Sequence, residues 1–261
     1  MVMMARVVEL RAMQYRRTFR ASIFSSFLSP VLFLLAMGIG LGSYVNQSGT
    51  ATQALGGLTY LQFLAPGLLA ATAMQAAAFE STFPIMGGLM WQKTFHAMYA
   101  TPVSGRDIVL GNLAWIAIRL AMISTIFTVV MTSFGATASP LIVLAIPAAV
   151  LTGMAFSAPI MAFAATQRNP EKFNAVFRFG ITPLFLFSGT FFPISNLPEM
   201  IRPIAWLSPL WHGVELSRQL ALGTIANEPL LAVAHIAVLA TIVALGTAWA
   251  YRTVEARLVR G

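Results

Sequence analysis

The chain has no cysteine and few charged residues among its 261 positions. Without cysteine it cannot form a disulfide framework, a thiolate metal site or a cysteine nucleophile. Charged residues make up 9% of the sequence, whereas soluble globular domains carry about 25%. That deficit argues against a soluble enzyme, a disordered protein and a nucleic-acid binder. With 58% hydrophobic residues and a mean hydropathy of +0.78, the composition indicates a polytopic membrane protein.

Motifs for ATP binding and catalysis are also missing. The nearest stretch to a Walker A motif, residues 87–94, has Gln92 in place of the second glycine. The histidines His96, His212 and His235 lack the spacing of zinc ligands, and no G-x-S-x-G nucleophile elbow is present. His235 lies on an apolar segment and is interpreted as a packing residue. We therefore expect no metal or cofactor in this chain, and any use of ATP requires a separate subunit.

Six apolar segments approach or exceed the roughly 20 residues that a helix needs to cross a bilayer. They cover residues 22–44, 59–88, 108–134, 140–166, 175–192 and 230–251. In the first segment Gly38 and Gly42 form a G-x-x-x-G motif, which permits close helix packing. The prediction is an all-α integral membrane protein with six transmembrane helices, in which residues 1–261 form one domain and 22–192 hold the first five spans.

The basic residues are unequally divided between the two sides of these spans. Thirteen of the 16 Lys and Arg residues lie in the N-terminal segment, in residues 89–107 and 167–178, or after residue 251. The other side carries Arg202 and Arg218, and Arg119 lies inside the third span. By the positive-inside rule both termini are cytoplasmic, with residues 230–261 forming the sixth span and a cytoplasmic tail. The net charge of +8 is therefore a topology signal rather than a sign of nucleic-acid binding.

The N-terminal segment has a helical repeat over residues 3–20. The apolar residues on one face are Met3, Met4, Val7, Val8, Leu10, Tyr15 and Phe19. Most arginines lie opposite, although Arg11 interrupts the apolar face. We predict an interfacial helix within residues 1–21 whose arginines are attracted to anionic lipid. The alternative is a plain basic anchor for the first span.

The cytoplasmic loop after the second span predicts a short amphipathic helix over residues 91–100. Trp91, Phe95, Met98 and Tyr99 fall near one side of it, and Thr101-Pro102 ends it. Ser104 or Asp107 is expected to cap the next helix. Such a helix suits contact with a partner protein, with Phe95 and Tyr99 as an aromatic pair. An ordinary amphipathic connector is the alternative.

The external segment between the fifth and sixth spans, residues 193–229, is too apolar for a solvated loop. Its prolines and tryptophans are Pro193, Pro198, Pro203, Pro209, Trp206 and Trp211. This punctuation predicts short re-entrant helices that enter the outer leaflet and return. Glu215 and Arg218 are three residues apart and are expected to pair. The alternative is an interfacial lid stabilised by its aromatic residues.

Two ionisable residues lie inside predicted spans, where a charge is costly and marks a functional candidate. At about 1.5 Å per residue, Glu80 and Arg119 lie roughly 12 and 16 Å from the cytoplasmic ends of their helices. Their similar depth predicts a buried ion pair facing the protein interior. Alternatively, Arg119 reaches the headgroups, and Glu80 is protonated or bonded to the backbone.

Residues 100–111 (ATPVSGRDIVLG), 188–198 (SGTFFPISNLP), 206–211 (WLSPLW) and 214–218 (VELSR) occur in this order. These motifs resemble the membrane subunit of ABC-2 type exporters, whose fold is shared with ABCG-like (type V) transporters. The resemblance covers nearly the whole chain. It is strongest to nodulation-type lipo-oligosaccharide permeases and polyketide-drug exporters.

The resemblance implies partners and sites. It implies a second permease copy, identical or similar, and two ATP-binding subunits that hold ATP and Mg²⁺. The implied coupling helix spans residues 91–102, and the coupling residues are Trp91, Lys93, Phe95, His96, Tyr99, Thr101, Pro102 and Arg106. The implied external gate contains Pro193, Pro198, Trp206, Pro209, Trp211, Glu215 and Arg218. The implied substrate path, along spans one, two and five, contains Met74, Phe79, Phe185 and Phe187.

One departure from the family affects the partner. Many members carry an acidic or Arg-Glu-rich stretch before the Thr-Pro-Val motif, whereas this chain has Gln92, Lys93, Thr94 and His96. The identity of the ATPase therefore stays open.

We expect a plasma-membrane permease subunit that exports an amphipathic or hydrophobic molecule, such as a lipid-linked saccharide, glycolipid or drug. Its partners are the second permease, the ATPases and membrane lipids, with no nucleic acid. An ion-coupled secondary transporter is one alternative, but it needs more intramembrane titratable groups than Glu80, Arg119 and His235. A membrane-embedded enzyme or assembly factor is another, and it needs a clustered polar site.

Overall fold

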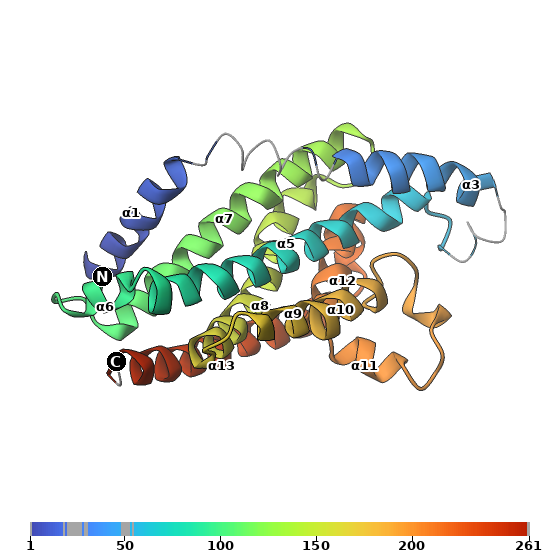
Figure 1. Cartoon of the computed structure of the whole chain (residues 1–261). Coiled ribbons are helices and arrows are strands. Elements are labelled where there is room, and N and C mark those ends of the chain that lie inside the picture. The colour runs from blue at the N-terminus through green and yellow to red at the C-terminus, as the bar shows by residue number, and fades with distance from the viewer. Residues whose placement is uncertain are drawn as a thin grey trace.

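The structure is a computed structural model that describes residues 2–17, 19, 28, 31–47, 53 and 55–259. Every regular element in these ranges is a helix, and the helices form an elongated bundle (Figure 1). The start of the predicted first span, residues 22–27, 29 and 30, lies outside the described residues. So do the last residues of the predicted tail, 260 and 261.

Four helices of the described chain are long and apolar enough to cross a membrane. They are α5 (Tyr60–Met86), which continues as the π-helical η2 (Gly87–Trp91), α7 (Gly105–Ser133), α8 (Ala145–Thr166) after the 3₁₀ helix η3 (Pro140–Leu144), and α13 (Pro229–Val259). α5 begins at a capping box, in which Thr59 and Gln62 each accept a hydrogen bond from the other's backbone N–H. α13 continues well past residue 251, so most of the predicted cytoplasmic tail is helical.

The first and fifth predicted spans correspond to shorter helices. Residues Val31–Gln47 form one apolar helix containing η1 (Leu34–Leu41) and α3 (Gly42–Gln47). In the fifth, α9 (Glu171–Val176), η4 (Phe177–Ile181) and α10 (Thr182–Phe187) follow one another directly. This helix ends at Phe187, five residues before the predicted end at residue 192, because Gly189 adopts a left-handed backbone with φ of 79°.

The N-terminal helix α1 (Val2–Arg16) lies along α7. Residues 1, 18, 20 and 21 of the predicted interfacial segment lie outside the described residues. Val7 is 2% exposed and packs on Gly111 of α7, where an added Cβ would lie 2.6 Å from the Val7 Cβ. α1 is therefore held by the bundle as well as having an exposed basic face.

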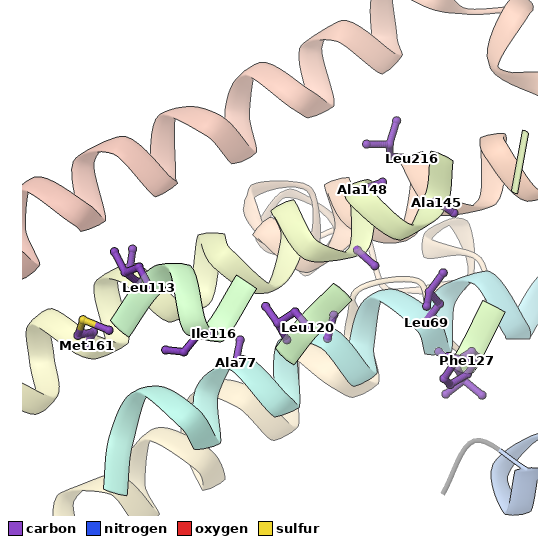
Figure 2. Packing of buried hydrophobic residues seen from close by; sticks show 14 of the residues in the cluster. Leu69, Ala77, Leu113, Ile116, Leu120, Phe127, Ala145, Ala148, Met161 and Leu216 are labelled. Carbon is purple, nitrogen blue, oxygen red and sulfur yellow. The ribbon is translucent and has the colours of Figure 1, made fainter. Parts of the chain in front are cut away.

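The core lies where α5, α7 and α8 meet, with α12 (Pro209–Leu222) closing one end. Figure 2 shows Leu69 of α5, Leu120 of α7 and Leu216 of α12 among the buried side chains that fill this space. In the most apolar stretch of α5 72% of residues are buried, against 22% in α13, so α5 is central and α13 peripheral. Gly38 and Gly42 face Leu61 and Tyr60 of α5, so their close packing is used within the chain.

The functional segments predicted from the sequence lie at opposite ends of the bundle. The short helix α6 (Thr94–Tyr99) shares one end with the start of α1 and the last turns of α13 (Figure 1). The other end carries α3, α11 (Arg202–Leu207), α12 and the 3₁₀ helices η5 (Ile194–Asn196) and η6 (Thr224–Ala226). We call these the α6 end and the α12 end.

Candidate functional site

α6 is shorter than the helix predicted over residues 91–100. Trp91 still belongs to η2, and Lys93 has a left-handed backbone with φ of 50°, which separates the two helices. After α6, Ser104 caps α7: its hydroxyl accepts a hydrogen bond from the Asp107 N–H at 3.1 Å. α6 is therefore a short separate helix, with the left-handed Lys93 before it and the Ser104 cap of α7 after it.

Phe95 holds α6 against the bundle. Its side chain is 2% exposed and lies on Gly88, where an added Cβ would be 2.6 Å from the ring. The Arg11 guanidinium carbon lies 5.6 Å from the ring centroid. Phe95 thus anchors α6 within its own chain, whereas the sequence predicted an aromatic ring presented to a partner.

The other predicted coupling residues remain largely accessible. The exposed ones are Trp91, Lys93, Tyr99, Thr101, Pro102 and Arg106, and His96 is half-buried. Together these seven residues form what we call the α6 surface. It combines two exposed aromatic rings with cationic groups, a composition that suits docking of a protein partner.

The structure brings Glu80 of α5 and Arg119 of α7 together, with their Oε1 and Nη2 atoms 3.2 Å apart. Their side chains are 21% and 12% exposed, so the pair is mostly withdrawn from the surface. The Arg119 guanidinium also lies 4.1 Å from the ring centroid of Tyr15 on α1. The pair therefore connects α5, α7 and α1.

Arg11, which interrupts the predicted apolar face of α1, belongs to the same polar region. Its Nε donates a 2.7 Å hydrogen bond to Oδ1 of the buried Asn112 on α7. Burial lowers the pKa of Arg11, and the attraction of the Glu80 carboxylate offsets part of that shift. Sequence reasoning missed the roles of Arg11, Tyr15 and Asn112, because helical spacing gives no information about contacts between helices.

At the α12 end, Arg218 is buried and makes several contacts. Nη1 donates to Glu215 at 2.6 Å, Nη2 donates to the Gly189 carbonyl at 2.8 Å, and Nε and Nη2 donate to the Phe63 carbonyl at 3.4 Å. The guanidinium lies 3.9 Å from the Phe63 ring centroid. Burial lowers the pKa of Arg218, and Glu215 opposes that effect. Arg218 thereby links α12 to α5 and to the bend after α10.

The prolines of the external segment lie at element boundaries. Pro193 precedes η5, Pro198 lies in the bend after it, and Pro209 starts α12, where its missing N–H costs no hydrogen bond. Trp206 of α11 is about half exposed, whereas Trp211 packs beside Ile194 and Leu197. The predicted short helices are present in this segment.

A histidine pair at this end was not predicted. Nδ1 of His212 on α12 lies 2.7 Å from Nδ1 of His235 on α13, which is 1% exposed. One ring must carry a proton on Nδ1 and donate a hydrogen bond to the unprotonated Nδ1 of the other ring. Burial and the neighbouring His235 lower the pKa of His212 to about 4. The packing interpretation of His235 omitted this partner because the two residues are far apart in sequence.

The residues expected on a substrate path have different environments. Met74 is fully buried in a cluster between α5, α8 and α12, so it cannot contact a substrate in this conformation. Phe79 and Phe187 are exposed. Phe185 is partly buried, and its ring centroid lies 4.9 Å from that of Phe191. Phe79 and Phe187 remain the candidates from this set.

Comparison with known proteins gives consistent matches. The family model of the ABC-2 type transporter matches residues 6–222. Nodulation protein J of Rhizobium leguminosarum bv. viciae is 34% identical over 226 residues, which cover 86% of this chain and 83% of that protein. Nodulation protein J of bv. trifolii is 33% identical over 80% of this chain and 77% of its own. The protein of that name from Rhizobium meliloti (strain 1021) is 32% identical, with 80% and 78% covered.

Proposed function

This chain belongs to the ABC-2 type transporter family, and we propose that it is the membrane permease subunit of an exporter whose ATP is hydrolysed by a separate subunit. The observation that carries the proposal is the family match across residues 6–222, which includes α6 and the helices that hold it. ATP and Mg²⁺ belong to the partner in this proposal, because Gln92 interrupts the nearest Walker A-like stretch.

We infer that the α6 end is cytoplasmic and that six helices cross the membrane. The helix Val31–Gln47 and the continuous helix from α9 to α10 would supply the two crossings beyond the four long helices. The excess of basic residues near the α6 end supports this orientation. Residues 193–228 then form a re-entrant segment on the outside, with the exposed apolar side chains of α11 in the outer leaflet.

Orientation can be tested by cysteine labelling without background, because the chain has no native cysteine. Single cysteines at the exposed positions Asn196 and Asn227 should react with an impermeant thiol reagent in intact cells. A cysteine at the exposed Ala100 should react only after permeabilisation; Ser104 is avoided because it caps α7. Labelling of Ala100→Cys in intact cells would overturn the orientation.

Coupling would begin at the α6 surface. When the ATPase subunits close, they would push on α6, and Phe95 would transmit the displacement to Gly88 of η2 and to Arg11 of α1. From Arg11 the hydrogen bond to Asn112 leads into α7. For export to be driven, the ligand must bind the inward-open and outward-open states with different affinity.

We propose an amphipathic or hydrophobic substrate, such as a lipid-linked saccharide, a glycolipid or a drug, that passes between two permease copies. Exposed apolar side chains support this path: Phe79 on α5, Phe187 on α10, and several on the helix Val31–Gln47. Gln75, one helical turn before Phe79, is also exposed and adds a polar group to that face. A face of this kind suits a ligand with both apolar and polar parts.

The coupling proposal is tested by removing aromatic contact area without disturbing the core. The double variant Trp91→Ala/Tyr99→Ala changes two exposed residues of the α6 surface, which are 57% and 36% exposed. Aromatic anchors dominate many interfaces, so loss of both should reduce co-purification of a co-expressed ATPase by about ten-fold or more. ATP hydrolysis stimulated by the permease should fall in parallel, with unchanged folded yield.

The matched control is Tyr44→Ala/Trp206→Ala, which removes two exposed aromatic rings at the α12 end. The control should keep wild-type co-purification. Equal loss in both variants, or no loss in either, would mean that the α6 surface does not dock the ATPase. Phe95 is left intact because its substitution would open the core.

A further inference from the structure

A recess of about 800 Å³ opens at the α6 end, between η2, α6, the end of α8 and the last turns of α13. Four of its lining residues are basic or titratable to a cation: Lys93, His96, Arg168 and Arg257. No acidic residue lines it. Among the residues that the structure describes, no carboxylate lies within ion-pair distance of these four side chains. The recess is therefore cationic and lacks an internal counter-charge.

The remaining lining is mostly apolar. Leu89, Met90, Ala165 and Ala256 contribute hydrocarbon surface to the recess. Thr253 also lines it, but its hydroxyl donates to the Trp249 and Ala250 carbonyls of its own helix. A ligand that fits must therefore combine an anionic group with an apolar portion.

The recess lies where membrane-capable helices end. Thr166 is the last residue of α8, Met90 lies one residue before the end of η2, and Arg257 lies in the last turn of α13. Trp91, beside the recess in sequence, is 57% exposed, and exposed tryptophans are enriched at membrane–water interfaces. In the proposed membrane arrangement, these helix ends lie where hydrocarbon gives way to phosphate headgroups.

We propose that this recess binds the phosphate headgroup of an anionic membrane phospholipid, with the basic side chains around the phosphate and the apolar lining beside the glycerol and first acyl carbons. Basic pockets between membrane helices on the cytoplasmic side bind such headgroups in other proteins. An acidic segment of a soluble partner would satisfy the charges equally but would leave the apolar lining without a counterpart.

Lys93 is the N-cap residue of α6, and His96 lies within that helix. A bound headgroup would connect these two residues to Arg168 after α8 and Arg257 on α13. Anionic lipid would then stabilise one position of α6 relative to the bundle. This consequence for coupling rests on the proposed exporter function, whereas lipid binding itself does not.

The test uses the purified full chain in nanodiscs of phosphatidylcholine containing phosphatidylglycerol, followed by native mass spectrometry of the lipids that each chain retains. Wild type should retain phosphatidylglycerol in preference to phosphatidylcholine. Arg168→Gln/Arg257→Gln should lower that preference by about five-fold for each arginine removed, the scale of one basic residue at an anionic surface. The matched control Lys172→Gln/Arg252→Gln removes the same charge from exposed neighbouring positions outside the recess and should retain the preference.

Two further arms identify the source of the anion and separate the proposals. Millimolar inorganic phosphate should not displace the lipid; complete displacement would make the recess a free-anion site and overturn the proposal. The same variants are then tested for ATPase co-purification in pure phosphatidylcholine. Loss of the ATPase with unchanged lipid preference would assign the recess to an acidic partner and overturn the proposal. An ATPase that never co-purifies contradicts the exporter function but leaves the lipid result intact.

Discussion

The two ends of the bundle treat their cations in opposite ways. At the α12 end Arg218 is enclosed and donates to Glu215 and to two backbone carbonyls from other segments. At the α6 end Lys93 and Arg168 are exposed, and no carboxylate of the described chain pairs with them. Arg218 is therefore paired within the chain, whereas Lys93 and Arg168 stay open to solvent or to a partner. Because Phe95 packs α6 within its own chain, the two ends differ in how their cations are paired rather than in how their helices are held.

The largest expected effect concerns the buried hydrogen bonds of Arg218 at the α12 end. Arg218→Met should lower the free energy of unfolding by about 3–5 kcal/mol, because it leaves Glu215 and the Gly189 carbonyl without their donor. Thermal unfolding and the folded fraction in detergent would measure the loss.

Arg202→Gln is the matched control at the same end. Arg202 also donates to two carbonyls, those of Leu197 and Ser195, but its side chain is about one-third exposed. Its substitution should cost only about 1 kcal/mol. Equal losses for the two variants would show that burial of Arg218 is not what stabilises this end.

A smaller effect is expected at Glu80 and Arg119, where the α6 end meets the core. Each single variant, Glu80→Gln or Arg119→Gln, should reduce folded yield, because it strands one charge of a largely buried pair. Glu80→Gln should reduce the folded yield more than Arg119→Gln, because the Glu80 carboxylate attracts both Arg119 and Arg11. When Arg119 is replaced instead, the Glu80 carboxylate still has Arg11 nearby.

The double variant Glu80→Gln/Arg119→Gln should recover much of the lost yield. A double-mutant cycle on folded yield and export measures the coupling. Simple addition of the two single defects would mean that the ion pair contributes nothing, and each residue would need its own explanation.

The smallest effect concerns pH at the α12 end. His212 has a pKa of about 4 in the folded chain, lowered from 6.5. The unfolded chain therefore binds more protons over this interval, and stability should fall as the pH decreases from 6.5 towards 4. His212→Asn should flatten that dependence in thermal-unfolding measurements. If the stability of His212→Asn depends on pH as steeply as that of wild type, the histidine pair is not the cause of the dependence.

Local patterns in the sequence were sufficient wherever the controlling contact lies within one helix. Hydropathy located the four long helices, although α13 runs beyond its predicted end because its last turns are polar yet still helical. Spacing predicted the Glu215–Arg218 contact, and residue type predicted Ser104 or Asp107 as a cap, of which Ser104 is the N-cap. The depth argument for Glu80 and Arg119 succeeded because adjacent helices bring residues of similar depth close together.

Contacts between distant segments were not predictable in this way. In the sequence, Arg11 only interrupted the apolar face of an amphipathic helix. In the structure, its side chain donates a hydrogen bond to Asn112 of α7. The aromatic pair Phe95 and Tyr99 looked equivalent, yet the ring of Phe95 is enclosed and that of Tyr99 is not. The histidine pair has the same origin, because nothing near His235 in sequence identifies His212 as its neighbour.

The sequence by itself determined that this chain is a helical membrane protein, since low charge and long apolar runs have few other stable solutions. Its ordered motifs resembled those of the ABC-2 type family, to which the chain belongs. Only the tertiary structure decided which polar groups became internal contacts and which stayed available to partners. The physical reason is that a charge's environment depends on every helix around it: the same packing that enclosed Arg218 left Lys93 and Arg168 at an open recess.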